Sequence, residues 1–317
     1  MGEAEPTPLS QQDRLAIVKG QYRGLDPEWV RLWNDHGSGM VRSDEVSPQE
    51  YRLDPAKYTL TYPLYGGGWV IGNLQTDAAW CSHICNQSKI KVIDVDYRLA
   101  PEFRFPTAIY DCWDAVRWAR ENAKVLNIQR DSISYGGISA GGHMSAVLNF
   151  FARDENVPVK CSLVVVPATD MRYLHPRNKR LNEKNCPYES ARLFQGVPWS
   201  PMGREQWFLK YWLGDDEAVQ DEILNNDWRM TPILAPDFKN LPPTHFVTAE
   251  FDLARDETKV FEELLRHAGN QVTSKQYAGM PHAFAMYNHP TRGLAKSWEY
   301  LEDTARLLRE AHGCADL

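Results

Sequence analysis

Long hydrophobic runs are missing from this 317-residue sequence. No stretch reaches the roughly 18 to 20 consecutive apolar residues that a membrane-spanning helix needs. The segment Met1–Pro6 is acidic and lacks both the basic and the apolar region of a secretory signal peptide. We therefore expect a cytoplasmic protein with no membrane span.

Cysteine is sparse, and basic residues do not predominate. The six cysteines show no paired C-x-x-C spacing, which argues against a disulfide scaffold and a zinc site and favours reduced thiols. Lys and Arg number 35 against 42 Asp and Glu, giving a formal net charge of −7. Such a chain has no global positive field for a phosphate backbone, so nucleic acid is not expected as a partner. The cysteines are Cys81, Cys85, Cys112, Cys161, Cys186 and Cys314.

The rest of the composition is that of a folded globular protein. Hydrophobic residues make up 43% of the chain, charged residues 24% and aromatic residues 11%, which excludes a disordered chain. The length suits either two domains or one large α/β domain with an inserted lid. No ligand cluster and no phosphate-binding G-x-G-x-x-G after a strand occurs, so we expect neither a metal nor an organic cofactor.

Strands and helices alternate along most of the chain, which predicts an α/β protein with a mostly parallel sheet covered on both faces. Strands are predicted at 59–62, 91–95, 132–135, 162–166, 244–248 and 272–277, and helices near 108–123, 140–153, 257–268 and 293–311. Gly269 is a plausible residue to end the third of these helices.

Residues 1–50 and roughly 170–235 do not fit this alternation. The second segment is rich in aromatic residues and proline, including Trp207 and Tyr211. Two interpretations stay open: extra helices that cover an edge of the sheet, or a mobile lid over an apolar pocket.

The strongest chemical signal is Gly137-Ile138-Ser139-Ala140-Gly141, a G-x-S-x-G motif between a predicted strand and a predicted helix. A serine on such a sharp turn is held in strained backbone geometry, and side chains two residues to either side would crowd it. We predict that Ser139 is a nucleophile. The alternative is a structural Gly-Ser turn.

A serine nucleophile needs amide donors for the negative oxygen of its intermediate. Gly66-Gly67-Gly68 follows a predicted strand and offers unhindered backbone N–H groups, and Ala140 at the start of the helix offers another. A glycine-rich turn without chemical function is the alternative.

The serine also needs a base, and His282 is the one histidine of nine that follows a late strand and precedes the last helix. A carboxylate must then orient the imidazole. Asp252 follows the strand that ends near Glu250, so we predict Asp252 for this role. Glu250 and Asp256 are competitors: Asp256 could cap the following helix, and Glu250 could lie under the lid. The order Ser139, Asp252, His282 is that of α/β hydrolases.

Together these motifs resemble the hormone-sensitive-lipase-like esterase family of α/β hydrolases over about residues 59–311. Within that family they look most like fungal esterases of secondary metabolism. The resemblance implies the α/β-hydrolase fold with a helical cap. Its N-terminal cap segment would be residues 1–50, and the hydrolase domain 51–317 would carry a cap insertion at about 170–235. It also implies a catalytic triad of Ser139, Asp252 and His282 and an oxyanion hole at Gly67, Gly68 and Ala140. The motifs are Gly66–Trp69, Asp96–Glu102, Phe105-Pro106, Gly137–Gly142, the Asp252 segment and His282–Phe284.

Two positions depart from the family pattern. Tyr65 stands where the family has a histidine before the three glycines, and Asp252-Leu253-Ala254 replaces Asp-Pro-Leu. The Tyr65 hydroxyl could brace the oxyanion loop in place of the histidine, or the loop could be reshaped.

The leading functional interpretation is a serine carboxylic-ester hydrolase acting on a small, apolar or aromatic metabolite, with Tyr65, Trp69, Trp207 and Tyr211 as candidate substrate-binding residues. Two alternatives stay open. One is a biosynthetic enzyme that uses the same pocket for lactonisation, acyl transfer, elimination or condensation. The other is a ligand receptor without catalysis. The expected partner is a small molecule, and a homodimer is compatible with the sequence.

Overall fold

The fold is described from a computed structural model. The residues it describes are 24–33, 47–49, 67–74, 77–178, 180–197, 200–289, 291 and 293–314. The predicted strand at 59–62, Tyr65 and Gly66 lie outside them.

Within the described residues, a four-stranded parallel sheet forms the centre of the molecule, with the strands in chain order. The β1–β2 and β2–β3 pairs run in uninterrupted register, for example Gly136 with Leu163 and Val164 with Phe246. The strands are β1 (Ser134–Ile138), β2 (Cys161–Val165), β3 (Thr244–Phe251) and β4 (Val272–Pro281). The predictions of a parallel sheet and of the strands near 132, 162, 244 and 272 are confirmed within one to four residues at their ends.

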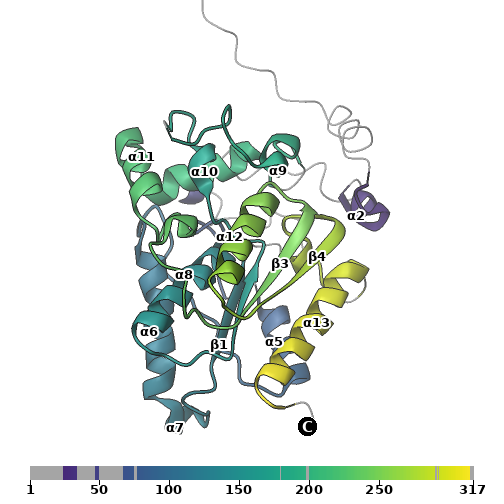
Figure 1. Ribbon diagram of the computed structural model, residues 1–317. Helices are drawn as coiled ribbons and strands as arrows, with labels where there is room; N and C mark the ends of the chain where they lie inside the picture. The colour runs from purple at the N-terminus through teal and green to yellow at the C-terminus, as the bar shows by residue number, and fades with distance from the viewer. Residues whose placement is uncertain are drawn as a thin grey trace, which may run out of the picture.

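Helices cover both faces of this sheet (Figure 1). On one face lie α6 (Thr107–Glu121), α8 (Ala140–Asp154) and α12 (Arg255–His267), and on the other α5 (Ala78–Ser88) and α13 (Ala295–Ala311). Four of the five are the predicted helices, and Gly269 follows α12 with a φ of +87°. Helix α5 has weak amphipathic patterning and was not predicted. The short helices α2 (Pro27–Leu32) and α7 (Ala123–Leu126) complete this part of the chain.

Successive side chains of a strand pack into hydrophobic clusters on opposite faces of the sheet, as the period of two in a β-strand requires. In β2, Leu163 and Val165 belong to the hydrophobic cluster that includes Tyr300 of α13. Val164 between them packs into the cluster of Phe150 from α8. The central strand β2 is buried at every position, and four of its five residues are apolar, as expected for a strand covered on both faces.

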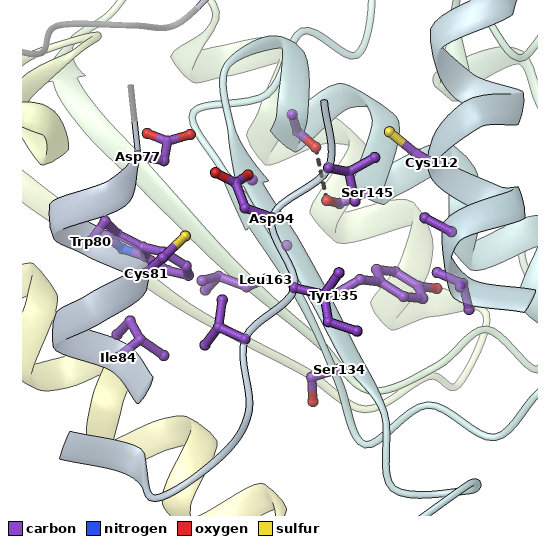
Figure 2. A pocket seen from close by; sticks show the side chains of 18 of the residues that line it. Asp77, Trp80, Cys81, Ile84, Asp94, Cys112, Ser134, Tyr135, Ser145 and Leu163 are labelled. Carbon is purple, nitrogen blue, oxygen red and sulfur yellow. Dashed lines mark hydrogen bonds between the residues drawn. The ribbon is translucent and has the colours of Figure 1, made fainter. Parts of the chain in front are cut away.

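The predicted strand at 91–95 is wrong, because residues 90–99 join no β-ladder. A strand exists only where its backbone groups pair with a neighbour. Between this extended segment and β1 lies a cavity of about 550 Å³, lined by Asp77, Cys81 and Asp94 on one side and Tyr135 of β1 on the other (Figure 2). Burial and the nearby charge of Asp94 raise the pKa of Asp77 to about 7.

Residues 170–235 form a helical layer beyond the carboxyl ends of the strands (Figure 1). Helix α10 anchors this layer through Trp212, which is fully buried and stacks on Trp69 with ring centroids 3.9 Å apart. The layer consists of η3 (Met171–Leu174), α9 (Glu189–Leu193), α10 (Met202–Leu213), α11 (Glu217–Asn226) and η4 (Pro232–Leu234), and η5 (Phe284–Met286) follows β4.

Candidate active site

Ser139 occupies a sharp turn between β1 and α8. Its φ of 58° and ψ of −113° are strained for a residue with a side chain. Backbone hydrogen bonds hold this conformation: the Ser139 amide donates to the Val165 carbonyl at 2.9 Å, and the His143 amide donates to the Ser139 carbonyl at 2.9 Å. The strand, turn and helix expected around the motif are present, and they project the hydroxyl from the end of the sheet.

A side chain would clash at some of the glycine positions around Ser139 and not at others. A Cβ on Gly137 would lie 2.6 Å from the Cα of Gly141, so the first motif glycine is required. A Cβ on Gly141 would meet nothing within 4 Å, which corrects the expectation of crowding on both sides. The crowded helical position is the next one, since a Cβ on Gly142 would lie 2.5 Å from the Val165 carbonyl oxygen. Gly142 is thus what lets α8 pack closely on β2.

Ser139, His282 and Asp252 meet in space from three separate segments. The Ser139 Oγ lies 2.8 Å from the His282 Nε2, and the His282 Nδ1 lies 2.8 Å from the Asp252 Oδ2. The other oxygen of Asp252 accepts from the Ala254 amide at 2.9 Å. This chain of contacts fits an imidazole that carries its proton on Nδ1 and accepts the serine proton at Nε2.

Burial and the charge of Asp252 act in opposite directions on the pKa of the His282 imidazole. Burial alone would lower its pKa, but the charge and hydrogen bond of Asp252, together with the charge of Glu205, outweigh burial and the opposing charge of Arg204. The pKa of His282 is therefore raised above its ordinary value. The site favours the imidazolium that forms when the histidine takes a proton.

The two competing acids have other partners. Asp256 lies inside the first turn of α12, where its carboxylate accepts from the Ser190 amide of α9 at 2.8 Å and so ties the helical layer to the sheet domain. Glu250 accepts from the Gly279 amide at 2.7 Å. Of the three carboxylates near the end of β3, Asp252 is the one whose hydrogen bond to His282 is described.

The glycine loop forms a tight turn whose shape depends on missing side chains. The Val70 and Ile71 amides both donate to the Gly67 carbonyl at 2.8 Å, and a Cβ on Gly67 would lie 1.9 Å from the Ile71 carbonyl oxygen. Gly68 has a φ of +48°, and a Cβ there would lie 2.2 Å from the Phe208 ring of α10. Both glycines keep the backbone accessible where substituents would not fit.

Ala140 is the first residue of α8 and is buried. Amides in the first turn of a helix have no acceptor within the helix, and the helix dipole adds partial positive charge there. The Ala140 amide, directly after Ser139, is therefore suited to hold a negative oxygen on the group attached to the serine.

The candidate substrate-binding aromatics fall into two settings. Trp69 is only 2% exposed; its ring stacks on Trp212, and the edge of His143 contacts both. Trp207 and Tyr211 are half-buried on α10, with ring centroids 4.9 Å apart. Tyr65 lies outside the described residues. Trp69 thus supports the glycine loop from within the core, whereas Trp207 and Tyr211 keep part of their surface accessible.

His143 belongs to this buried support. Burial lowers the pKa of His143 to about 4. The ring is neutral near pH 7 and packs as an aromatic group against Trp69 and Trp212.

Sequence reasoning missed the charged pair on α10 that acts on His282. Arg204 is buried, and the Glu205 carboxylate accepts a hydrogen bond from the Ser200 hydroxyl. The apolar spacing of Met202–Leu213 is the signal that would have indicated a helix here. Nothing in that spacing indicates which residues face His282.

Across the part of the chain that the structure describes, no group of three His, Cys, Asp or Glu side chains is arranged to hold a metal ion. Within the same residues, no helix combines the length and apolarity needed to cross a membrane.

Comparisons with known proteins agree with this geometry. A profile described as "alpha/beta hydrolase fold" matches residues 62–286. An arylesterase from Saccharolobus solfataricus is 33% identical over 254 residues, covering 78% of this chain and 77% of the relative. A versiconal hemiacetal acetate esterase from Dothistroma septosporum is 31% identical over 277 residues, covering 84% and 80%.

Solved structures give the same result. A Pyrobaculum calidifontis esterase superimposes with a TM-score of 0.68 at 29% identity, covering 77% of this chain and 74% of that one. The named esterases favour ester hydrolysis over the biosynthetic alternative. The chain belongs to the hormone-sensitive-lipase-like esterase family of the α/β hydrolases, and it is a carboxylesterase-like hydrolase.

Proposed function

We propose that the protein hydrolyses a small carboxylic ester through an acyl-enzyme on Ser139. The observation that carries this proposal is the pair of 2.8 Å contacts from the Ser139 Oγ to His282 and from His282 to the Asp252 carboxylate. A serine hydroxyl is a weak nucleophile at neutral pH unless a base of this kind takes its proton.

In the first half of the reaction, the Ser139 Oγ attacks the ester carbonyl while its proton moves to the His282 Nε2. Asp252 stabilises the resulting imidazolium. The tetrahedral intermediate then collapses: the bond to the alcohol oxygen breaks, and His282 returns the proton to the departing alcohol. In the second half, water attacks the acyl-enzyme with the same base, and the acid leaves as Ser139 regains its proton.

The oxyanion of each intermediate would accept hydrogen bonds from the amides of Gly67, Gly68 and Ala140. Removal of one such donor typically lowers kcat by about 10²–10³-fold. The steric demand at both glycines and the position of Ala140 at the start of α8 support this assignment.

The substrate is a small ester with an apolar or aromatic part. Trp207 and Tyr211 on α10 would contact it, and residues 170–235 would form the cap that shields the site from water. The relatives support this chemistry, because one is named an arylesterase and another an acetate esterase.

The test is turnover of 1-naphthyl acetate and of p-nitrophenyl acetate, butyrate and octanoate, with products identified by mass spectrometry. We expect one free acid and one free alcohol per ester, and a loss of about 10⁴-fold or more in kcat for Ser139→Ala. The matched control is Ser132→Ala, since the Ser132 hydroxyl also contacts a histidine, His312 Nδ1 at 2.9 Å, near the other end of β1. Undiminished turnover by Ser139→Ala, or rearranged products in place of free acid, would overturn the proposal.

A further inference from the structure

The end of β4 departs from the regular ladder just before His282. Ala249 pairs with Tyr277, but the next pair is Phe251 with Pro281. One residue of β3, Glu250, therefore stands opposite a bulge of three residues in β4. Backbone amides in a bulge have no ladder carbonyl directly opposite them and need another acceptor.

Glu250 supplies that acceptor with its side chain. The Glu250 Oε2 accepts from the Gly279 amide at 2.7 Å, in the middle of the bulge. Gly279 has a φ of +76°, a left-handed conformation that favours glycine. The carbonyl of the same residue accepts from the Asp26 amide at 2.9 Å. Both polar backbone groups of Gly279 are thus held from outside β4.

This contact joins the two strand ends that carry the acid and the base. Glu250 lies two residues before Asp252, and Gly279 lies three residues before His282. Spans of two and three residues cannot absorb a change in the separation of the two strand ends. The distance between the strand ends at the bulge therefore controls how closely the His282 ring approaches Asp252 and Ser139.

We propose that Glu250 is a positioning residue that fixes the bulge of β4, and through it the His282 imidazole, by accepting the Gly279 amide hydrogen bond. This inference rests on the proposed function, since it concerns the same base. The carboxylate acts through Gly279 and need not contact substrate.

Glu250→Asp and Glu250→Gln test the proposal. Aspartate keeps the charge but withdraws the oxygens by about 1.5 Å, whereas glutamine keeps an oxygen at the right distance to accept from Gly279. We expect Glu250→Asp to lower kcat and the rate of fluorophosphonate labelling by about 10- to 100-fold while KM changes less than about threefold, because a misplaced base slows the chemical step. We expect Glu250→Gln to keep kcat within about threefold of the wild type.

Asp303→Ala is the matched control. The Asp303 carboxylate also supports β4, accepting from the Tyr277 hydroxyl at 2.8 Å, but it makes no described contact with the bulge. The Asp303→Ala substitution should lower the unfolding temperature without lowering kcat. Wild-type kcat in Glu250→Asp, an equal loss in Glu250→Gln, or an equal loss in Asp303→Ala would overturn the inference. Failure of the wild type itself to hydrolyse esters would instead overturn the proposed function.

Discussion

At the residue scale, the site depends on the balance of charge around one imidazole. His282 is buried, which opposes its charged form, yet Asp252 and Glu205 together outweigh that effect. Asp252 does so through its charge and a direct hydrogen bond, and Glu205 through its charge alone. The fold is therefore arranged to accept a proton at His282.

This balance predicts the pH dependence of hydrolysis. Only the neutral imidazole can take the serine proton, and its pKa is raised above the ordinary 6.5, so kcat/KM should fall as pH drops through a midpoint above 6.5. The measurement is kcat/KM from pH 5 to 9 with an ester that has no ionisable group. A flat profile, or a midpoint below the ordinary value, would contradict the assigned base.

The raised pKa of His282 makes folding stability depend on pH in the opposite direction from hydrolysis. A raised folded-state pKa means that the native protein binds the proton more tightly than the unfolded chain does. The stabilisation is fully present below the unfolded-state pKa and is lost as pH rises through the folded-state pKa. At this one residue, conditions that favour catalysis remove a contribution to folding stability.

Residues with a strong local signature were predictable, and residues defined by their neighbours were not. Ser139 stands in a G-x-S-x-G motif, and Asp252 and His282 each follow a predicted strand, in the chain order typical of α/β hydrolases. Glu250 has no signature, because its role arises from a bulge in another strand. Glu205 was missed because its effect depends on how α10 faces the site.

At the scale of elements, apolar patterning predicted the buried strands and the amphipathic helices. It failed for 91–95, where β-branched apolar residues favour a strand but the segment does not pair with β1 across the cavity (Figure 2). It also missed α5, whose apolar face is short. Pairing is a property of two segments, so the sequence of one segment cannot establish it.

The packing of α8 on β2 gives a prediction at this scale. Gly142→Ala should destabilise the protein by about 1–3 kcal/mol, because the new methyl group would overlap the Val165 carbonyl and push the helix from the sheet. Gly141→Ala should be neutral or stabilising by up to about 1 kcal/mol, since its methyl group meets nothing and alanine favours the helix.

Urea denaturation of the two variants measures the difference, and each serves as the control for the other. Equal destabilisation by both substitutions would contradict the steric assignment. So would greater destabilisation by Gly141→Ala.

At the scale of the whole molecule, the parallel sheet carries the reacting groups to one edge. Ser139, Asp252 and His282 follow β1, β3 and β4, and parallel strands have their carboxyl ends on the same side. The helical layer of residues 170–235 lies over that edge (Figure 1). The sequence predicted that the three reacting residues would meet there, because each follows a predicted strand of a mostly parallel sheet.

The most direct measurement is the site of covalent labelling by a fluorophosphonate. Intact-mass and peptide analysis should find one adduct per chain, located on Ser139, with hydrolysis lost in proportion to labelling. Ser139→Ala, folded to the same extent by circular dichroism, should take up no adduct. An adduct on another residue, or full hydrolytic activity in a chain whose Ser139 is completely labelled, would contradict the account.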